Sequence, residues 1–262
     1  MNERARPQAP FLAKFIFFFL LVVLYLPVLM MMANSFLMKV GDQTQFTLSW
    51  YTSIFNDREI IEALIRTLWV AGASATGAAL LGSLAALALS KTEFQFKKTL
   101  TSMSFISLVV PELVFALSLL SWFFILGFSL SLTTVILSHI TFSVCFVLMT
   151  VLARTEAFDP SIEDAARDLG ASDWVLLQKI WWPLMRPAVL AGLLLGFLLS
   201  FDDFLISFYM NGVGSDTLPI RLYVAMRLGL SPKLSALATL MFFISFLLIF
   251  GLMKSKSSRA IA

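Results

Sequence analysis

The sequence predicts an all-α polytopic membrane protein with six transmembrane helices. Of its 262 residues, 59% are hydrophobic and only 13% are charged, whereas a soluble domain carries about 25% charged residues. So few charges cannot cover a water-facing surface, and so much apolar mass excludes a disordered or collagen-like chain. Apolar runs of about 20 residues, long enough to cross a bilayer as a helix, recur along the chain.

Six spans follow from these runs. They are 13–34, 67–89, 105–126, 131–152, 188–209 and 236–253. The first run follows a basic tail, but it is too long for a signal peptide and lacks a small-residue cleavage pattern, so we expect a retained helix. The third and fourth runs form one nearly uncharged stretch that is too long for a single helix, and we expect it to turn at 127–131.

The basic residues predict that both termini are cytoplasmic. With this orientation, thirteen of the 19 Lys and Arg residues fall in inner segments and six in outer ones, as the positive-inside rule requires. Residues 1–12 and 254–262 are then cytoplasmic tails, 13–253 is the transmembrane domain, and 153–187 is a large cytoplasmic loop. The same bias accounts for the net charge of +3, so we expect no nucleic-acid partner.

The remaining single residues predict structure more than chemistry. Cys145 is the only cysteine, so it cannot form an intrachain disulfide, and together with the single histidine, His139, it makes no zinc site. Small residues recur at every fourth position in spans 67–89 and 188–209, which favours close packing of helices. These are Ser74, Ala78, Gly82, Ala86 and Ser90, then Gly192, Gly196 and Ser200.

The cytoplasmic loop 153–187 carries its own predicted structure. Asp159 or Ser161 caps a helix over Ser161–Leu169, which ends at Gly170. A second helix starts near Ser172 or Asp173 and runs to Pro183. Structured loops of this length are usually functional. The residues alone leave two interpretations open: a scaffold that returns the chain to the membrane, or a docking surface for a soluble partner.

The loop resembles the EAA motif of ABC-importer permeases. That motif is Glu-Ala-Ala, three residues, Gly, nine residues, and Ile-x-Leu-Pro. Here Glu163–Gly170 (EDAARDLG) and Ile180–Pro183 (IWWP) keep its spacing, with Asp164 in place of the motif's Glu and Trp182 in place of its Leu. The resemblance implies the type I ABC-importer permease fold, in which a coupling helix sits in a groove of the ATP-hydrolysing subunit.

Carried onto this sequence, the resemblance implies five coupling residues. They are Glu163, Asp164, Ala165, Ala166 and Gly170. No phosphate-binding Gly-x4-Gly-Lys-Ser/Thr loop occurs in the chain. We therefore expect a permease that is not itself an enzyme and binds no cofactor, with ATP and Mg held by a partner ATPase.

Three acidic residues, Glu112, Asp202 and Asp203, lie inside the predicted spans, where ionisable groups are costly and usually functional. Adjacent helix positions differ by about 100°, so both aspartates cannot face lipid. No Lys or Arg lies inside the spans to neutralise them, apart from Lys14 at the very start of the first span. If ionised, they need a cation from outside the chain; alternatively, they pair with a partner subunit, or one stays protonated.

Phe208 and Tyr209 add aromatic faces that favour ammonium groups. This pattern predicts an organic polycation as cargo, not a sugar or an anion.

Several further segments resemble the permeases of spermidine/putrescine importers. They are Tyr25–Pro27, Asn34–Phe36, Val110–Glu112, Leu199–Ser207, Gly212–Pro219 and Leu234–Leu240. The resemblance implies a subunit of the bacterial inner (plasma) membrane that transports a polyamine. It would work with a second homologous permease, two copies of a cytoplasmic ATP-binding subunit, and an extracytoplasmic substrate-binding protein that meets 35–66 and 210–235.

Other functions remain open on the sequence. The same architecture suits an importer of an Fe(III) species or of another organic cation. A secondary transporter would use Asp202 and Asp203 as proton carriers but would leave the EAA spacing unexplained. An intramembrane enzyme is disfavoured, because the chain has neither a His-Glu-x2-His nor a Gly-x-Ser-x-Gly string.

Overall fold

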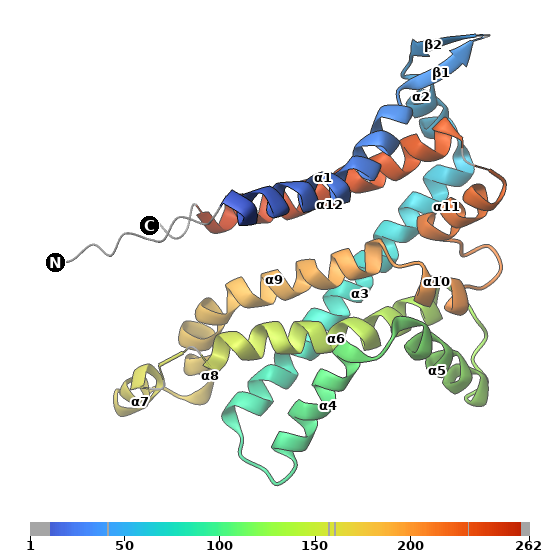
Figure 1. The fold of residues 1–262 in the computed structure, drawn as a ribbon. Coiled ribbons are helices and arrows are strands. Elements are labelled where there is room, and N and C mark those ends of the chain that lie inside the picture. The colour runs from blue at the N-terminus through green and yellow to red at the C-terminus, as the bar shows by residue number, and fades with distance from the viewer. Residues whose placement is uncertain (1–10, 41, 157, 160, 230, 258–262) are drawn as a thin grey trace. The chain divides into compact units, whose positions relative to one another are not determined.

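The computed structural model is built almost entirely of helices (Figure 1). It describes residues 11–40, 42–156, 158–159, 161–229 and 231–257. The chain divides into two compact units. Unit one comprises the residues up to Asp57 together with Ala225–Phe242, and unit two comprises Arg58–Val224 together with the residues from Phe243 onward.

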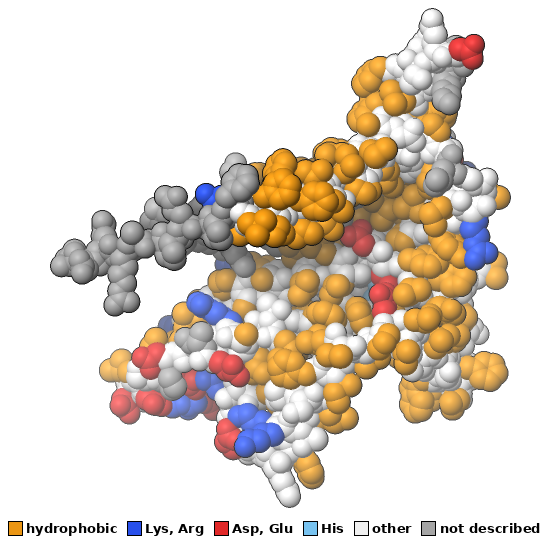
Figure 2. Space-filling view, viewed as in Figure 1, with side chains coloured by type: hydrophobic (Ala, Val, Ile, Leu, Met, Phe, Trp, Pro, Cys, Tyr) orange, Lys and Arg blue, Asp and Glu red, His pale blue; other side chains and the backbone are white. Residues whose placement is uncertain are grey.

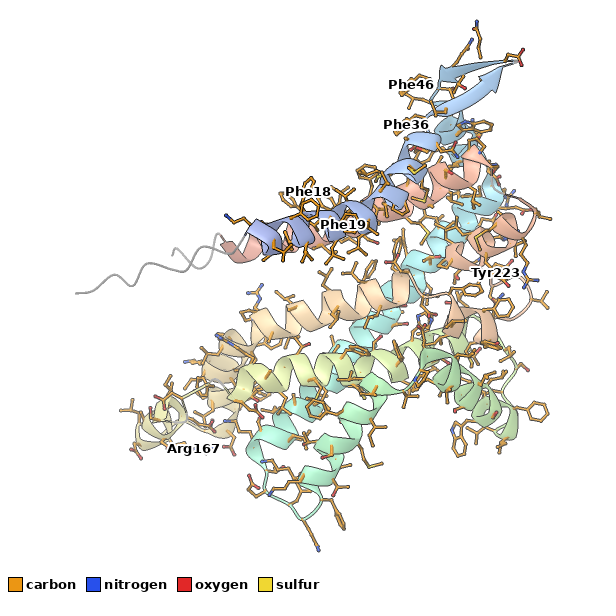
Figure 3. All side chains as sticks on the ribbon, in the orientation of Figure 1. Phe18, Phe19, Phe36, Phe46, Arg167 and Tyr223 are labelled. Carbon is orange, nitrogen blue, oxygen red and sulfur yellow. The ribbon has the colours of Figure 1, made fainter. Side chains whose placement is uncertain are left out.

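Unit one holds a long apolar helix and a small hairpin. Its elements are α1 (Phe11–Asn34), β1 (Leu37–Val40), β2 (Gln43–Phe46), α2 (Ser49–Phe55) and the first part of α12 (Pro232–Ser257). The strands pair antiparallel, with Leu37 opposite Phe46. Phe36 stacks on Phe46 with ring centroids 5.5 Å apart (Figure 3). The sequence predicted no strands here, because the hairpin is short and the four residues of β2 are exposed, without an alternating buried face.

Unit two is organised around three long helices: α3 (Arg58–Lys91), α6 (Leu132–Glu156) and α9 (Trp182–Phe201). Shorter elements surround them. These are α4 (Lys97–Val109), α5 (Glu112–Ile125), α7 (Ser161–Asp168), α8 (Asp173–Leu176), the π-helical turn η1 (Leu177–Trp181), α10 (Leu205–Met210) and α11 (Leu218–Arg227). One buried apolar cluster joins α3, α6 and α9, and a second joins α3, α5, α6 and α10.

The rows of small residues lie where the three long helices approach one another. A Cβ at Gly82 of α3 would stand 2.9 Å from the Val144 carbonyl oxygen of α6, and one at Gly192 of α9 would stand 3.0 Å from Val147 Cγ1. Glycine therefore permits contacts in unit two that a larger residue would block, as expected for helices that pack in a membrane.

Five helices are long and apolar enough to span a membrane, within the residues that the structure describes. They are Leu12–Asn34, Arg58–Lys91, Leu132–Glu156, Asp173–Phe201 and Pro232–Phe250, and Glu112–Ile125 is a shorter apolar helix. The all-α polytopic fold is confirmed. The predicted count of six long spans is not, because 105–126 is divided between α4 and α5. The break falls at Pro111, since a proline disfavours helical backbone at the residue before it.

A second prediction is corrected at 188–209. Helix α9 ends at Phe201, residues 202–204 form a break, and α10 begins at Leu205. The 100° spacing expected between Asp202 and Asp203 therefore does not apply, because neither residue lies in a helix.

The loop 153–187, which the sequence predicts to be cytoplasmic, has the predicted structure in its first half. Helix α7 occupies Ser161–Asp168, and Gly170 has φ +84°, the left-handed conformation expected of a helix-ending glycine. The second predicted helix does not stop at Pro183, because α8, η1 and α9 continue as one span to Phe201. The π turn before Pro183 accommodates the missing backbone N–H. Of the predicted tails, 1–10 and 258–262 lie outside the described residues, and α12 extends through 254–257.

Candidate functional site

The three acidic residues predicted within the spans line one hollow of unit two. Glu112 comes from the start of α5, and Asp202 and Asp203 come from the break between α9 and α10. The hollow has a volume of about 480 Å³, and the rest of its described lining is apolar: Phe142, Leu195, Leu198, Leu199, Phe204 and Leu205. No Lys or Arg occurs among these described lining residues. Figure 2 shows acidic side chains within a largely hydrophobic face.

The two aspartates have different surroundings although they are adjacent. Asp202 is exposed, and both of its carboxylate oxygens lie 3.4 Å from the Ser245 hydroxyl. Asp203 is only 8% exposed and accepts hydrogen bonds from the backbone N–H groups of Ser207, at 2.8 Å, and Ile206, at 3.4 Å. The break leaves the first N–H groups of α10 without helical partners, and the Asp203 carboxylate satisfies two of them.

His139 of α6 is a further partner of Asp203. Its Nε2 lies 3.1 Å from Asp203 Oδ1 and 3.2 Å from the Ser207 hydroxyl, and its Nδ1 is hydrogen-bonded to the Ser200 hydroxyl. Asp203 therefore has a hydrogen-bond partner within the chain, and the expected cation partner of the aspartates stays a prediction. The sequence reasoning considered only Lys and Arg as partners. The overlooked signal is Ser200, a hydroxyl at the end of the row of small residues on α9, which is a hydrogen-bond partner for a polar side chain on a neighbouring helix.

Phe208 and Tyr209 lie on α10, apart from the described lining of the hollow. Phe208 contacts Phe204 and Tyr223, with ring centroids 5.3 and 6.0 Å away. Tyr209 packs against the apolar cluster that contains Ile206 and Met210. The structure therefore groups these rings with one another, and their role in the cargo pathway stays a prediction.

Helix α7 presents an exposed face with apolar and acidic side chains. Ile162, Asp164 and Ala165 are exposed, and Leu169, just after the helix, is 89% exposed. The N-terminus of the helix is ordered by Asp159, whose carboxylate accepts the Ser161 N–H at 3.0 Å. That hydrogen bond lowers the pKa of Asp159 below its ordinary value.

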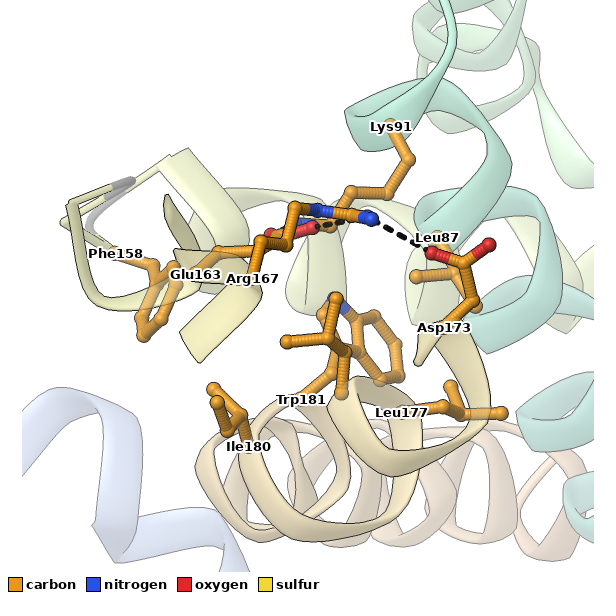
Figure 4. A pocket seen from close by; sticks show the side chains of 10 residues that line it. Leu87, Lys91, Phe158, Glu163, Arg167, Asp173, Leu177, Ile180 and Trp181 are labelled. Atoms are coloured by element: carbon orange, nitrogen blue, oxygen red, sulfur yellow. Dashed lines mark hydrogen bonds and ion pairs between the residues drawn. The ribbon is translucent and has the colours of Figure 1, made fainter. Parts of the chain in front are cut away.

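Glu163 differs from its neighbours on α7 because it turns inward. Its carboxylate pairs with Lys91 at the end of α3 and, at 3.3 Å, with Arg167, which itself pairs with Asp173 at 2.9 Å (Figure 4). These four side chains line a cavity of about 420 Å³, with Trp181 among its apolar walls. The ion pairs thus link α7 to the end of α3 and to the start of α8. Of the five predicted coupling residues, Glu163 contacts this chain while Asp164 and Ala165 face outward.

The amino-acid sequence matches a known family of membrane transport proteins. Residues 78–261 match the family model described as "Binding-protein-dependent transport system inner membrane component". The chain is 39% identical over 228 residues to the spermidine/putrescine transport system permease protein PotC of Escherichia coli K12, covering 86% of each chain. It is 36% identical to PotC of Haemophilus influenzae, covering 91% of this chain and 94% of that one. It is 34% identical to the putrescine permease PotI of E. coli K12, covering 83% and 80%.

Solved structures show the same fold at lower sequence identity. A chain from a bacterial ABC transporter that imports the acidic polysaccharide alginate superposes with a TM-score of 0.72 over 96% of this chain and 94% of that one, at 16% identity. A chain from an amino acid ABC transporter superposes with a TM-score of 0.63 over 81% and 100%, at 18% identity. The type I importer permease fold predicted from the EAA spacing is confirmed.

Proposed function

We propose a polyamine cargo for this chain on the premise that it belongs to the family of binding-protein-dependent transport system inner membrane components. As a member, it is the permease subunit of an ABC importer and not an enzyme, and the ATPase is a separate subunit. It is a multi-pass membrane protein.

The acidic hollow is the observation that carries the polyamine assignment. Three carboxyl groups converge on a space whose other described walls are apolar and contain no basic side chain. Such a surface favours a flexible molecule with ammonium groups and methylene segments, because an ammonium group pairs with a free carboxylate while the methylenes contact leucine and phenylalanine. Three curated relatives are named as permeases for spermidine/putrescine or putrescine, which supports the same class of cargo.

Helix α7 is the proposed dock for the cytoplasmic ATPase. Its exposed face offers Ile162, Ala165 and Leu169 for apolar contact, with Asp164 beside them as a charge. Alanine allows close approach of a partner helix or groove. In this proposal the chain itself binds no cofactor, and ATP with Mg stays on the ATPase.

The remaining partners and the orientation follow from the same family. We propose a second homologous permease that completes the pathway, two copies of the ATP-binding subunit, and an extracytoplasmic binding protein. The protein lies in the bacterial inner membrane with both termini cytoplasmic, as the thirteen-to-six distribution of basic residues favours. The β1–β2 hairpin then lies outside the membrane, where the binding protein delivers cargo.

Uptake by the complete importer tests the proposal. Cells that express all of its subunits are given labelled putrescine, with unlabelled spermidine, ferric citrate or choline as competitor. We expect labelled uptake that needs the ATPase and that only the polyamine suppresses. Suppression by ferric citrate or choline, or no polyamine uptake in assembled transporter, would refute the assignment.

A further inference from the structure

We propose that His139 is a specificity-determining positioning residue of the cargo pathway: it holds the Asp203 carboxylate against the start of α10, so that Asp202 is the acidic group left free to receive cargo. The inference rests on the proposed polyamine function. It concerns a histidine that lies outside the EAA segment and outside the described lining of the acidic hollow.

His139 stands at the junction of three segments that converge near the break. Its ring is 1% exposed on α6, and it contacts Ser200 on α9, Asp203 in the break and Ser207 on α10. A buried ring with hydrogen-bond partners at both nitrogens is fixed in rotation and in position. The break between α9 and α10 is thereby tied to α6 through a single side chain.

The hydrogen bonds of Asp203 explain why this side chain is not free to meet cargo. Oδ1 receives the Ser207 N–H and faces His139 Nε2, while Oδ2 faces the Ile206 N–H. The side chain of Glu112 is a further hydrogen-bond partner of Asp203. Because a carboxylate only accepts hydrogen bonds, Nε2 carries the proton of the ring, and Nδ1 accepts from the Ser200 hydroxyl. Asp202 has no comparable support among the described residues, since its recorded partner is the Ser245 hydroxyl at 3.4 Å.

Without the imidazole of His139, the Asp203 carboxylate would no longer be held at the start of α10. Asp203 would lose a buried donor, and an under-satisfied carboxylate at the edge of a hollow turns toward water and cations. The hollow would then present a further carboxylate beside Asp202. An additional carboxylate favours spermidine, which has three amino groups, over putrescine, which has two. His139 is therefore expected to set the relative preference for the two polyamines, and not only the amount of active protein.

The test measures the ratio of spermidine to putrescine uptake by the complete importer, at equal membrane levels of His139→Ala, His139→Gln and wild type. We expect His139→Ala to raise the ratio about threefold, the size of one partly screened charge pair. We expect His139→Gln to stay within about twofold of wild type, because its amide both donates and accepts. Adding Asp203→Asn to His139→Ala removes the released charge and returns the ratio toward wild type.

The possible results distinguish failure of the inference about His139 from failure of the proposed polyamine function. Absence of uptake of both polyamines by wild type refutes the proposed function. Uptake by wild type with an unchanged ratio in His139→Ala refutes the role of His139, as does a ratio in His139→Ala that Asp203→Asn leaves unaltered. If His139→Ala does not reach the membrane, Ser200→Ala loosens the ring instead. A raised ratio in Ser200→Ala then supports the inference, and a wild-type ratio overturns it.

Discussion

Replacing Lys91 with glutamine tests whether the ion pairs between α7 and the end of α3 position α7, the proposed coupling helix. Lys91 ends α3, and its ammonium pairs with Glu163 of α7. The two side chains are 35% and 19% exposed, so the pair is partly shielded from water. Exposed pairs contribute about 0.2–1 kcal/mol, and we take the upper end for this networked pair. A loss of about 1 kcal/mol corresponds to about a fivefold fall in the ratio of correctly placed to displaced α7.

The assay is transport by the complete importer in proteoliposomes, scored as cargo moved per ATP hydrolysed. We expect Lys91→Gln to lower that ratio up to about fivefold at low salt, and by less at high salt, where wild type loses part of the same interaction to screening. The matched control is Lys97→Gln. Lys97 pairs at 2.7 Å with Glu93, four residues away, so its loss removes a similar charge without detaching α7.

The refuting result is a Lys91→Gln importer that couples as well as Lys97→Gln. It would mean that α7 is positioned without the Lys91–Glu163 pair. A reduced ratio that is the same at all salt concentrations would also contradict the electrostatic explanation, because a partly exposed ion pair is sensitive to ionic strength.

Three other substitutions test separate parts of the structure. Asp202→Asn should lower polyamine uptake about tenfold while binding of the ATPase is retained, and normal uptake would remove Asp202 from the pathway. Leu169→Glu should weaken co-purification of the ATPase, because it places a charge on the exposed α7 face; undiminished recovery would argue against this dock. Gly212→Ala should lower the free energy of unfolding by about 1–3 kcal/mol, and the thermal midpoint with it, because its Cβ would lie 2.1 Å from the Leu130 carbonyl oxygen. Gly72→Ala is the control, because its Cβ would meet nothing within 4 Å. Equal midpoints would refute that close contact.

The features predicted well from sequence are those set by local pattern. Unbroken apolar length is enough to place α1 and α6, because the cost of an unsatisfied backbone in lipid leaves a helix as the alternative. The glycine after α7 was predictable for a similar reason, since a left-handed residue ends a helix most easily as glycine. Spacing of small residues likewise indicated the helix faces that pack.

Local sequence patterns do not identify residues that pair across a long separation in the chain. Nothing in the sequence near Asp203 indicates that His139, 64 positions earlier, lies 3.1 Å from its carboxylate. The Lys91–Glu163 pair joins residues that no periodicity relates. Charge counting by span also restricted the search to Lys and Arg, although an imidazole donates a hydrogen bond to a carboxylate equally well.

The break at Asp202–Phe204 shows how a strongly apolar context can conceal a local signal. Hydropathy favoured one span through 188–209, but an aspartate just before Leu205–Met210 also matches a helix start, where a carboxylate meets free backbone N–H groups. That second interpretation gives the two aspartates unlike roles. Asparagine retains a capping oxygen, so Asp203→Asn keeps much of the helix start, whereas Asp202→Asn removes an exposed charge with no compensating structure. Two adjacent and chemically identical residues therefore differ in their surroundings because only one of them faces the first turn of α10.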